Sequence, residues 1–316
     1  MKGFAPPSWA RNPHCQTLLG AWGWRRHEPL TRERVALPDG DFVDLDWLSD
    51  APGDGPLLLI LHGLEGSSAS PYVGRLLKTC RDARWRAVVM NFRGCSGEPN
   101  RLARSYHCGE TGDLDSVIRH LRSRNPQGLC AVGYSLGGAV LLNWLGEQRT
   151  AAGLLAAAAI SVPFDLEGAA ERLNRGFSRL YQWALLRQLR RSLSRKASCH
   201  GHPPPPLRSL TTFRAFDDAI TAPLHGFANA GDYYRRASCR PHLRHIAVPT
   251  LLIQAADDPF LMPTNPLRPD ELSPPMRLEL SAFGGHVGFI EGGSPLVPRS
   301  WLEPRLARFF GAYLSR

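Results

Sequence analysis

The pentapeptide Gly133-Tyr134-Ser135-Leu136-Gly137 constrains this chain most, because it lies between a strand-like and a helix-like segment. The apolar run 129–132 has the length of a buried strand, and residues 138–145 are good helix formers. A serine on such a sharp strand-to-helix turn is exposed, and glycines two positions away leave room for the tight backbone. The pattern therefore predicts a nucleophile elbow centred on Ser135, whereas the pentapeptide without this context would indicate only a βα turn.

The remaining apolar segments alternate between strand-like and helix-like patterns, which indicates βαβ units and a mainly parallel sheet. A hairpin is expected around Pro38-Asp39-Gly40-Asp41, and the continuous apolar run 56–61 is typical of a strand buried on both faces. Further strands are expected at 86–91, 129–135, 154–162, 250–255 and 276–281, and helices at 72–83, 111–124, 136–148 and 301–314. The sequence thus predicts an α/β fold, with helices flanking a central sheet.

Residues 163–249 interrupt this alternation, because they contain no strong strand pattern. Apolar residues between 173 and 185 have helical spacing, the prolines 203–206 follow, and residues 211–234 are rich in aromatic and small side chains. We expect a helical cap inserted between two core segments, residues 1–162 and 250–316. Such a cap would cover the carboxyl ends of the strands, where open α/β sheets bind ligands.

Composition narrows the class of protein. The 316 residues, 43% hydrophobic and 21% charged, are ordinary for a soluble enzyme. No apolar run approaches the roughly 18–20 residues of a membrane span, and residues 1–20 lack the apolar centre of a secretory signal. Seven cysteines without a C-x-x-C pair favour neither a disulfide framework nor a cysteine zinc site. We expect a reduced, cytoplasmic protein.

The net charge of +10 raises the question of an anionic partner. Residues 171–200 hold eight arginines and lysines but one acidic residue, Glu171. Since no nucleic-acid-binding motif accompanies them, nucleic acid is not expected as a partner. A solvated helix face, an anionic lipid surface or an acidic substrate would each explain the basic stretch 172–196.

A serine hydroxyl becomes a useful nucleophile when a base removes its proton. In an α/β-hydrolase fold the base is a histidine after the last strand, and the acid precedes it in the chain. His286, in the glycine-rich loop 284–289, has this place. The acid is expected after strand 250–255, where Asp258 is favoured because it lies farther into the loop than Asp257, the alternative.

An oxyanion hole needs two backbone N–H groups. One is expected from Leu136, directly after the serine, and the other from Leu64, in the loop after strand 56–61. His62 is interpreted as a structural residue that shapes this loop. Cys95 is interpreted as a loop cysteine, because no base is assigned to it.

The acidic residues near 110–115 are interpreted as ordinary helix-start residues. The spacing of His107, Glu110 and Asp113 matches no metal motif. No metal or organic cofactor is expected.

Longer strings of residues resemble the YheT-type α/β hydrolases, bacterial relatives of a eukaryotic group of membrane-linked lipid hydrolases. These strings lie at residues 11–17, 37–45, 62–66, 91–101, 133–138, 257–260 and 284–289. The resemblance implies carboxylic-ester hydrolysis, with Ser135, Asp258 and His286 on the family's catalytic triad. It also implies that the insertion 163–249 is a cap.

The sequence therefore predicts a serine hydrolase that forms an acyl-enzyme from short- to medium-chain acyl esters or acylglycerols. An acyltransferase or a thioesterase would use the same triad and differ only in the acyl acceptor or the leaving group. A lipid-surface binding protein is a third hypothesis, suggested by the basic stretch. Chain length, head group and oligomeric state do not follow from these patterns.

Overall fold

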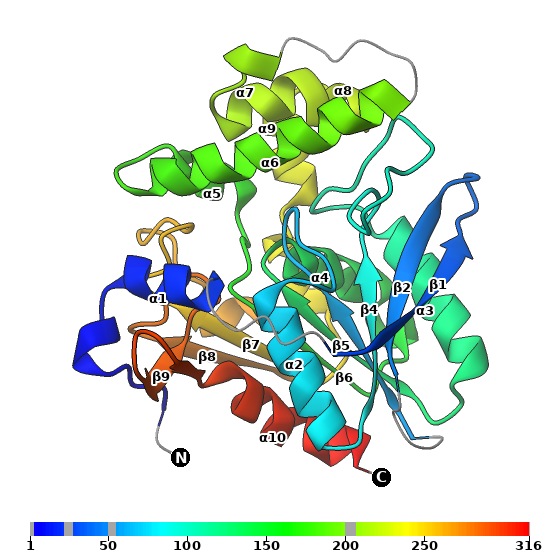
Figure 1. Cartoon of the computed structure of the whole chain (residues 1–316), viewed down its shortest axis with the longest axis vertical. Helices are drawn as coiled ribbons and strands as arrows, with labels where there is room; N and C mark the ends of the chain where they lie inside the picture. Colours follow the sequence, from blue (N-terminus) through cyan, green and yellow to red (C-terminus); the bar gives the residue numbers. More distant parts are fainter. Residues whose placement is uncertain (1–2, 22–27, 50–54, 200–206, 316) are drawn as a thin grey trace.

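The computed structural model describes residues 3–21, 28–49, 55–199 and 207–315, so the prolines 203–206 lie outside the described residues. Its centre is a sheet with the strand order β1-β2-β4-β3-β5-β6-β7-β8 (Figure 1). Both β1–β2 and β2–β4 pair antiparallel, and every other neighbouring pair is parallel. The strands are β1 (Leu30–Ala36), β2 (Phe42–Leu48), β3 (Leu57–Leu61), β4 (Arg86–Asn91), β5 (Leu129–Tyr134), β6 (Ala156–Ile160), β7 (Thr250–Ala255) and β8 (Met276–Ser281). The expected mainly parallel sheet is confirmed.

Strand β3 explains why the core has two halves. All five of its residues are buried, and alternate side chains point to opposite faces of the sheet. Leu57, Leu59 and Leu61 join one apolar cluster, with α3 (Gly112–Arg124) and α4 (Leu136–Gln148). Leu58 and Ile60 join the other, with α2 (Pro71–Asp82) and α10 (Leu302–Leu314). The continuous apolar run 57–61 is thus the pattern of a strand covered by helices on both sides.

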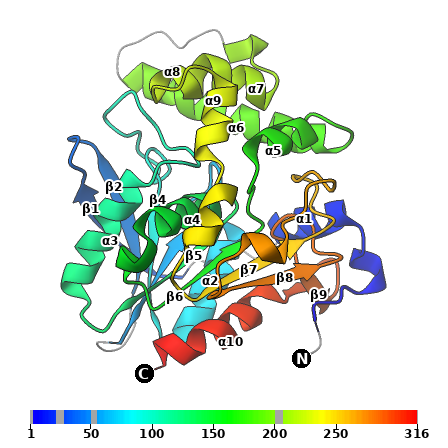
Figure 2. The same cartoon turned by 180° about the vertical axis from the view of Figure 1, so that it is seen from behind.

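Between β6 and β7, every regular element that the structure describes is helical. Apart from the 3-10 turn Arg240–His245, which packs against α4, these elements gather at one end of the molecule, beyond the carboxyl ends of the parallel strands (Figures 1 and 2). They are α5 (Leu166–Leu173), α6 (Ser178–Cys199), α7 (Phe213–Phe216), the π-helical turn Asp217–Thr221, α8 (Ala222–Leu224), α9 (Ala230–Ala237) and the 3-10 turns Leu207–Ser209 and Arg240–His245. Within the described ranges, no helix has the length and apolarity needed to cross a bilayer.

Two features were not expected from the sequence. Helix α1 (Pro13–Ala21) precedes the first strand, and β9 (Ile290–Gly293) pairs with β10 (Pro298–Ser300) in a small separate sheet. The two are joined by Gln16, whose side chain bonds both the carbonyl and the N–H of Ile290. Long-range contacts of this kind, and not local periodicity, define both elements. Short 3-10 turns also occur at Ser8–Ala10, Arg149–Ala152 and Pro269–Glu271.

The string 91–101, one of those that carry the family resemblance, has a structural explanation in this fold. The guanidinium of the buried Arg93 bonds Asp41, at the β1–β2 turn, and both carboxylate oxygens of Asp113 in α3. Asn100 also donates to Asp41, at 2.6 Å. Buried charges are tolerated when they are paired in this way. These residues join the antiparallel hairpin to the parallel part of the sheet.

Candidate active site

Ser135, His286 and Asp258 meet at the carboxyl edge of the parallel sheet. Ser135 follows β5 and precedes α4, Asp258 follows β7, and His286 follows β8. The Nε2 atom of His286 lies 3.0 Å from Ser135 Oγ. The Nδ1 atom of the same ring lies 2.9 Å from Asp258 Oδ2. The three side chains that the sequence predicted together therefore form one continuous hydrogen-bonded chain.

The two adjacent aspartates have different partners. Asp258 is buried, and its carboxylate accepts the His286 ring and the backbone N–H of Phe260, the latter at 2.8 Å. Asp257 Oδ1 accepts the backbone N–H of Gly285 at 2.9 Å. Burial raises the pKa of the Asp257 carboxyl. Asp257 thus contacts the loop of the histidine, whereas Asp258 contacts the imidazole itself.

The His286 loop is held by residues to which no role was assigned from the sequence. The backbone N–H of His286 donates to Thr17 Oγ1 at 2.9 Å, and that of Val287 donates to Ser161 Oγ at 2.9 Å. The ring of Phe260 stacks on the imidazole, with centroids 3.9 Å apart and planes 1° apart. The only sign of this contact in the sequence was the string 11–17, which is one of those that carry the family resemblance. Its residue pattern by itself predicted neither α1 nor the contact of Thr17 with His286.

The elbow glycines are required by close backbone approaches. A Cβ atom at Gly133 would lie 2.4 Å from the carbonyl oxygen of Gly137. One at Gly137 would lie 2.4 Å from the carbonyl oxygen of His62. Ser135 itself has φ 50° and ψ −116°, a strained conformation for a residue with a side chain. At the elbow the start of α4 therefore packs directly against the backbone at the end of β3.

Leu64 and Leu136, the two expected oxyanion donors, line the same pocket as Ser135. Within the described ranges, neither amide N–H donates to another protein group. The carbonyl of Gly63 accepts from His62 Nδ1 at 2.7 Å and from the Gly66 N–H at 3.0 Å. The Gly63 C=O and the Leu64 N–H belong to one trans peptide unit, in which the two groups point in opposite directions. The Leu64 N–H therefore points away from His62 Nδ1 and from the Gly66 N–H. Both amides are thus available to a ligand.

His62 has a well-defined protonation pattern. Its Nε2 atom accepts the backbone N–H of Phe92 at 3.1 Å, which assigns the proton to Nδ1. Burial lowers the pKa of His62 to about 4, so the ring is neutral near pH 7. A neutral ring in this tautomer donates to the Gly63 carbonyl. This agrees with the interpretation of His62 as a residue that shapes the loop.

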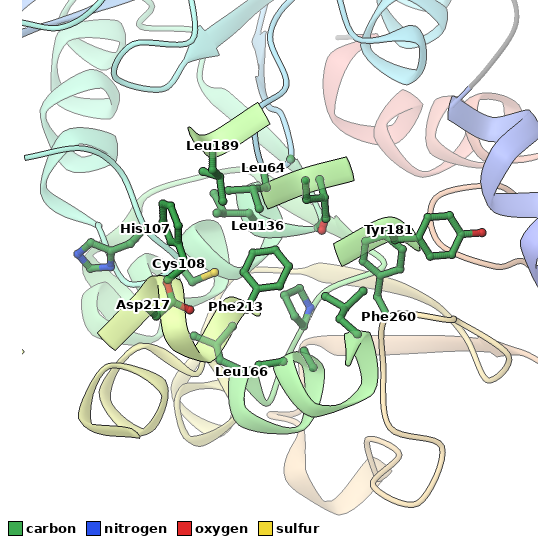
Figure 3. Close-up of a pocket in the computed structure, with 18 of the residues that line it drawn as sticks. Leu64, His107, Cys108, Leu136, Leu166, Tyr181, Leu189, Phe213, Asp217 and Phe260 are labelled. Carbon is green, nitrogen blue, oxygen red and sulfur yellow. The ribbon is translucent and has the colours of Figure 1, made fainter. Parts of the chain in front are cut away.

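A cavity of about 400 Å³ adjoins Ser135 and His286, and most of its lining is apolar. Tyr181 and Phe260 lie at one end of the view in Figure 3, and His107, Cys108 and Asp217 lie at the other. Leucines and phenylalanine from both the core and the helical segment line the space between them, among them Leu64, Leu136, Leu166, Leu189 and Phe213. An apolar substrate chain fits this lining.

The far end of the cavity holds titratable groups. Burial raises the pKa of Asp217 to about 6, although Thr221 and Tyr234 donate hydrogen bonds to its carboxylate. Burial lowers the pKa of His107 to about 3 and that of His225 to about 4. This end of the cavity therefore combines a buried carboxyl group with two neutral imidazoles.

Asp113 does not join His107 and Glu110 in a ligand cluster, which agrees with the interpretation that their spacing is no metal motif. Asp113 pairs with Arg93. The ligand atoms of His107, Glu110 and His225 do lie within 4.8 Å of one another, and two imidazoles and a carboxylate are a possible metal-ligand set. Arg104, however, forms an ion pair with Glu110. This positive charge disfavours a cation at the cluster.

Cys95 does not resemble a nucleophile in this structure. Burial, followed by the nearby Glu65 carboxylate, raises the pKa of its thiol. A thiol that stays protonated reacts poorly, since the thiolate is the nucleophilic form.

This strand order, together with a serine on a strand-to-helix elbow and a histidine after the last strand, defines the class of α/β hydrolases. The chain belongs to the alpha/beta hydrolase fold family, whose match covers residues 56–293. It is 44% identical to the Escherichia coli protein named "Putative esterase YheT", over 100% of this chain and 93% of that protein. The resemblance to YheT-type hydrolases is therefore confirmed.

More distant relatives are named as a phospholipase and a lipase. Human phospholipase ABHD3 is 30% identical, over 92% of this chain and 74% of that protein. The monoacylglycerol lipase of Saccharomyces cerevisiae is 32% identical, over 80% of this chain and 58% of the lipase. Among solved structures, an esterase of Pyrococcus furiosus has a TM-score of 0.59 at 14% identity, over 99% of both chains, which supports the fold. The chain is a carboxylic ester hydrolase.

Proposed function

We propose that the chain hydrolyses carboxylic esters through a Ser135–His286–Asp258 triad and an acyl-enzyme intermediate. The observation that carries the proposal is the hydrogen-bonded chain of 3.0 Å and 2.9 Å from Ser135 Oγ through His286 to Asp258. In this arrangement the imidazole can accept the hydroxyl proton at Nε2, while Asp258 holds the ring by Nδ1–H and stabilises the imidazolium.

Each step of the reaction follows from these roles. Ser135 Oγ attacks the ester carbonyl, and His286 takes its proton. The N–H groups of Leu64 and Leu136 stabilise the oxyanion. Collapse of the tetrahedral intermediate expels the alcohol, which takes the proton from His286 and leaves an acyl-serine. Water, deprotonated by His286, then attacks the acyl-serine, and the carboxylic acid leaves as Ser135 regains its proton.

The cavity supports a proposal for the substrate class. Its volume of about 400 Å³ and its leucine-rich lining suit an acyl chain of short to medium length or an acylglycerol. Helices α5 to α9 supply much of that lining, which supports residues 163–249 as a cap over the site. A series of p-nitrophenyl esters of graded chain length measures the preference as kcat/KM. A monotonic fall from acetate onward would contradict the chain-binding role of the cavity.

Ser135→Ala tests the nucleophile. The variant should lose p-nitrophenyl butyrate hydrolysis by ~10³-fold or more and should no longer be labelled by a fluorophosphonate. Ser116→Ala is the matched control, because the Ser116 hydroxyl bonds within its own helix α3. Equal rates of wild type and Ser135→Ala would refute the triad.

The surface around the site supports a second proposal, a peripheral contact with anionic lipid. Phe177 directly precedes α6, Leu180 and Trp183 lie in its first two turns, and the three are 48%, 55% and 57% exposed. The ring of Phe177 contacts His14 on α1, with centroids 4.3 Å apart. Farther along the exposed side of α6 follow Arg187, Arg191 and Arg195, with Arg187 over the Trp183 ring. An apolar face with arginines beside it suits the interface of an anionic bilayer.

Vesicle sedimentation tests this contact. Wild type should sediment with phosphatidylglycerol vesicles at low salt, and less with phosphatidylcholine vesicles. Leu180→Ser/Trp183→Ser should bind several-fold more weakly. Leu296→Ser is the control, because this leucine is 92% exposed but belongs to the β9–β10 hairpin. Equal binding of both variants, or none by wild type at low salt, would refute the proposal.

A further inference from the structure

The carboxylate of Glu65 lies between the loop of the Leu64 amide and helix α6. The Tyr106 hydroxyl donates to Glu65 Oε1 at 2.9 Å. Ser192, on α6, donates to Glu65 Oε2. The backbone N–H of Glu65 donates in turn to the Tyr106 oxygen, at 2.7 Å. One residue next to Leu64 thus joins three separate segments of the chain.

These contacts restrain the peptide units on both sides of Leu64. The preceding unit is held through the Gly63 carbonyl, which accepts from His62 and Gly66. The following unit is held through the Glu65 N–H, by Tyr106. Glu65 has φ 53°, a strained conformation for a residue with a side chain, and it persists only when its surroundings impose it. The direction of the Leu64 N–H therefore depends on the Glu65–Tyr106 contact.

Tyr106 is a rigid support for this contact, whereas α6 belongs to the helical segment over the site. The Tyr106 ring stacks on Phe92, with centroids 5.2 Å apart and planes 11° apart. Two turns before Ser192, residues Ala184 and Leu185 of α6 line the cavity, as does Leu189. A substrate chain that packs against these residues would hold α6, and hence Ser192, in place.

Helix α6 also contacts the other half of the site. At its first residue, Ser178 Oγ donates to the carbonyl oxygen of Pro259 at 2.7 Å. Farther along, the Tyr181 ring lies 5.1 Å from that of Phe260, which stacks on His286. One helix of 22 residues therefore contacts both the acid–base loop and the oxyanion loop.

We infer that Glu65 is a positioning residue that makes the oxyanion hole depend on the seating of α6. Its carboxylate restrains the Leu64 amide through the hydrogen bond with Tyr106. The hydrogen bond with Ser192 makes the position of that carboxylate depend on the position of α6. A substrate that fills the cavity thereby completes the oxyanion hole. The inference rests on the proposed function, because it takes the Leu64 N–H as an oxyanion donor.

Three variants test this role by steady-state kinetics on p-nitrophenyl butyrate. Glu65→Ala should lower kcat ~10- to 100-fold and change KM less than about threefold, because complete loss of one oxyanion donor costs about 10²–10³ in kcat. Glu65→Gln retains a side-chain oxygen for Tyr106 and should recover most of the rate. Ser192→Ala should lower kcat several-fold, and adding it to Glu65→Ala should cause no further loss, since both remove one connection.

A trifluoromethyl ketone with a butyl chain gives a second readout, because it forms an oxyanion adduct with a serine. Its affinity should fall in Glu65→Ala by a factor similar to the fall in kcat. Ser198→Ala is the control on the same helix, since the Ser198 hydroxyl bonds the Ser194 carbonyl. Thermal unfolding of each variant checks folding. If Glu65→Ala does not fold, Glu65→Gln and Ser192→Ala still report on the role.

Two results would overturn the inference. One is a Glu65→Ala enzyme with kcat within twofold of wild type. The other is a Ser192→Ala effect that adds fully to that of Glu65→Ala. Failure of the proposed function looks different, because Ser135→Ala would then keep its activity. Wild-type activity that requires Ser135 but not Glu65 refutes only the positioning role.

Discussion

Strained residues surround the candidate active site. Ser135, Glu65, Ser161, Val287 and Phe289 all have φ between 46° and 58°, without being glycine. Each such conformation costs about 1–3 kcal/mol, so its neighbours must impose it. The N–H of Ser135 bonds the Ile160 carbonyl at 2.8 Å, and that of Val287 bonds Ser161. These imposed backbone conformations therefore set the directions of the side chains and amides that line the site.

The adjacent aspartates allow a sharp test at the residue scale. Asp258→Asn should lower kcat/KM ~10²- to 10⁴-fold, because an amide no longer stabilises the imidazolium or its tautomer. Asp257→Asn should lower it less than about tenfold, because an amide oxygen can still accept the Gly285 N–H. The measurement is kcat/KM on p-nitrophenyl butyrate from pH 6 to 9. Similar losses in the two variants would contradict the assignment of Asp258.

At the scale of elements, the decisive contact is that of α4 with the end of β3. A Cβ atom at Gly137 would lie 2.4 Å from the His62 carbonyl oxygen and 2.7 Å from that of Leu61. Both are backbone atoms at the root of the oxyanion loop, so they cannot move aside cheaply. The elbow therefore places the serine and also sets the distance between α4 and the Leu64 loop.

Gly137→Ala should destabilise the fold by about 1–3 kcal/mol through overpacking and should lower activity by displacing the oxyanion loop. The matched control is Gly311→Ala in α10, where the nearest atom to a Cβ would be 3.9 Å away, on Trp85. That variant should gain about 0.5–1 kcal/mol, because alanine is the better helix former. Urea denaturation measures both. A Gly137→Ala protein as stable as wild type would rule out the close approach.

The whole molecule should be sensitive to acid because it buries neutral histidines. Burial lowers the pKa of His62 to about 4, that of His107 to about 3 and that of His225 to about 4, all from 6.5. Below pH 6.5 the unfolded chain binds protons that the folded chain does not, so stability falls as the pH falls. The Asp217 carboxyl has the opposite effect on stability between pH 3.8 and about pH 6, because in that range the folded state holds a proton that the unfolded state has lost.

The free energy of unfolding should therefore drop by about 2–4 kcal/mol from pH 7 to pH 5, after discounting for the partial exposure of His225. Urea denaturation at half-unit pH steps measures the slope. Asp217→Asn should steepen the fall, because it removes the opposing proton, and His225→Asn should make it shallower. A stability that is flat or rises on acidification would contradict the burial of neutral rings.

Much of the fold could be predicted because its pattern is local. The run 57–61, the elbow 133–137 and the helix-forming residues after it depend on side-chain periodicity and on the backbone preferences of neighbours. Ser135, Asp258 and His286 could be proposed for the same reason, since each lies in the turn or loop after a recognisable strand. The choice between Asp257 and Asp258 was harder, because it depends on the course of one loop.

The tertiary structure decided the contacts between segments that are far apart in the chain. The bond from the His286 N–H to Thr17 spans 269 positions, and that from Ser192 to Glu65 spans 127. No local pattern encodes such pairs, since they exist only after the sheet has brought its loops together. The amino-acid sequence by itself determined the elbow, the strand order along the chain and the residue types at the strand ends. The tertiary structure decided how the Leu64 amide is aimed and which helix lies over it, because both depend on packing between segments far apart in the chain.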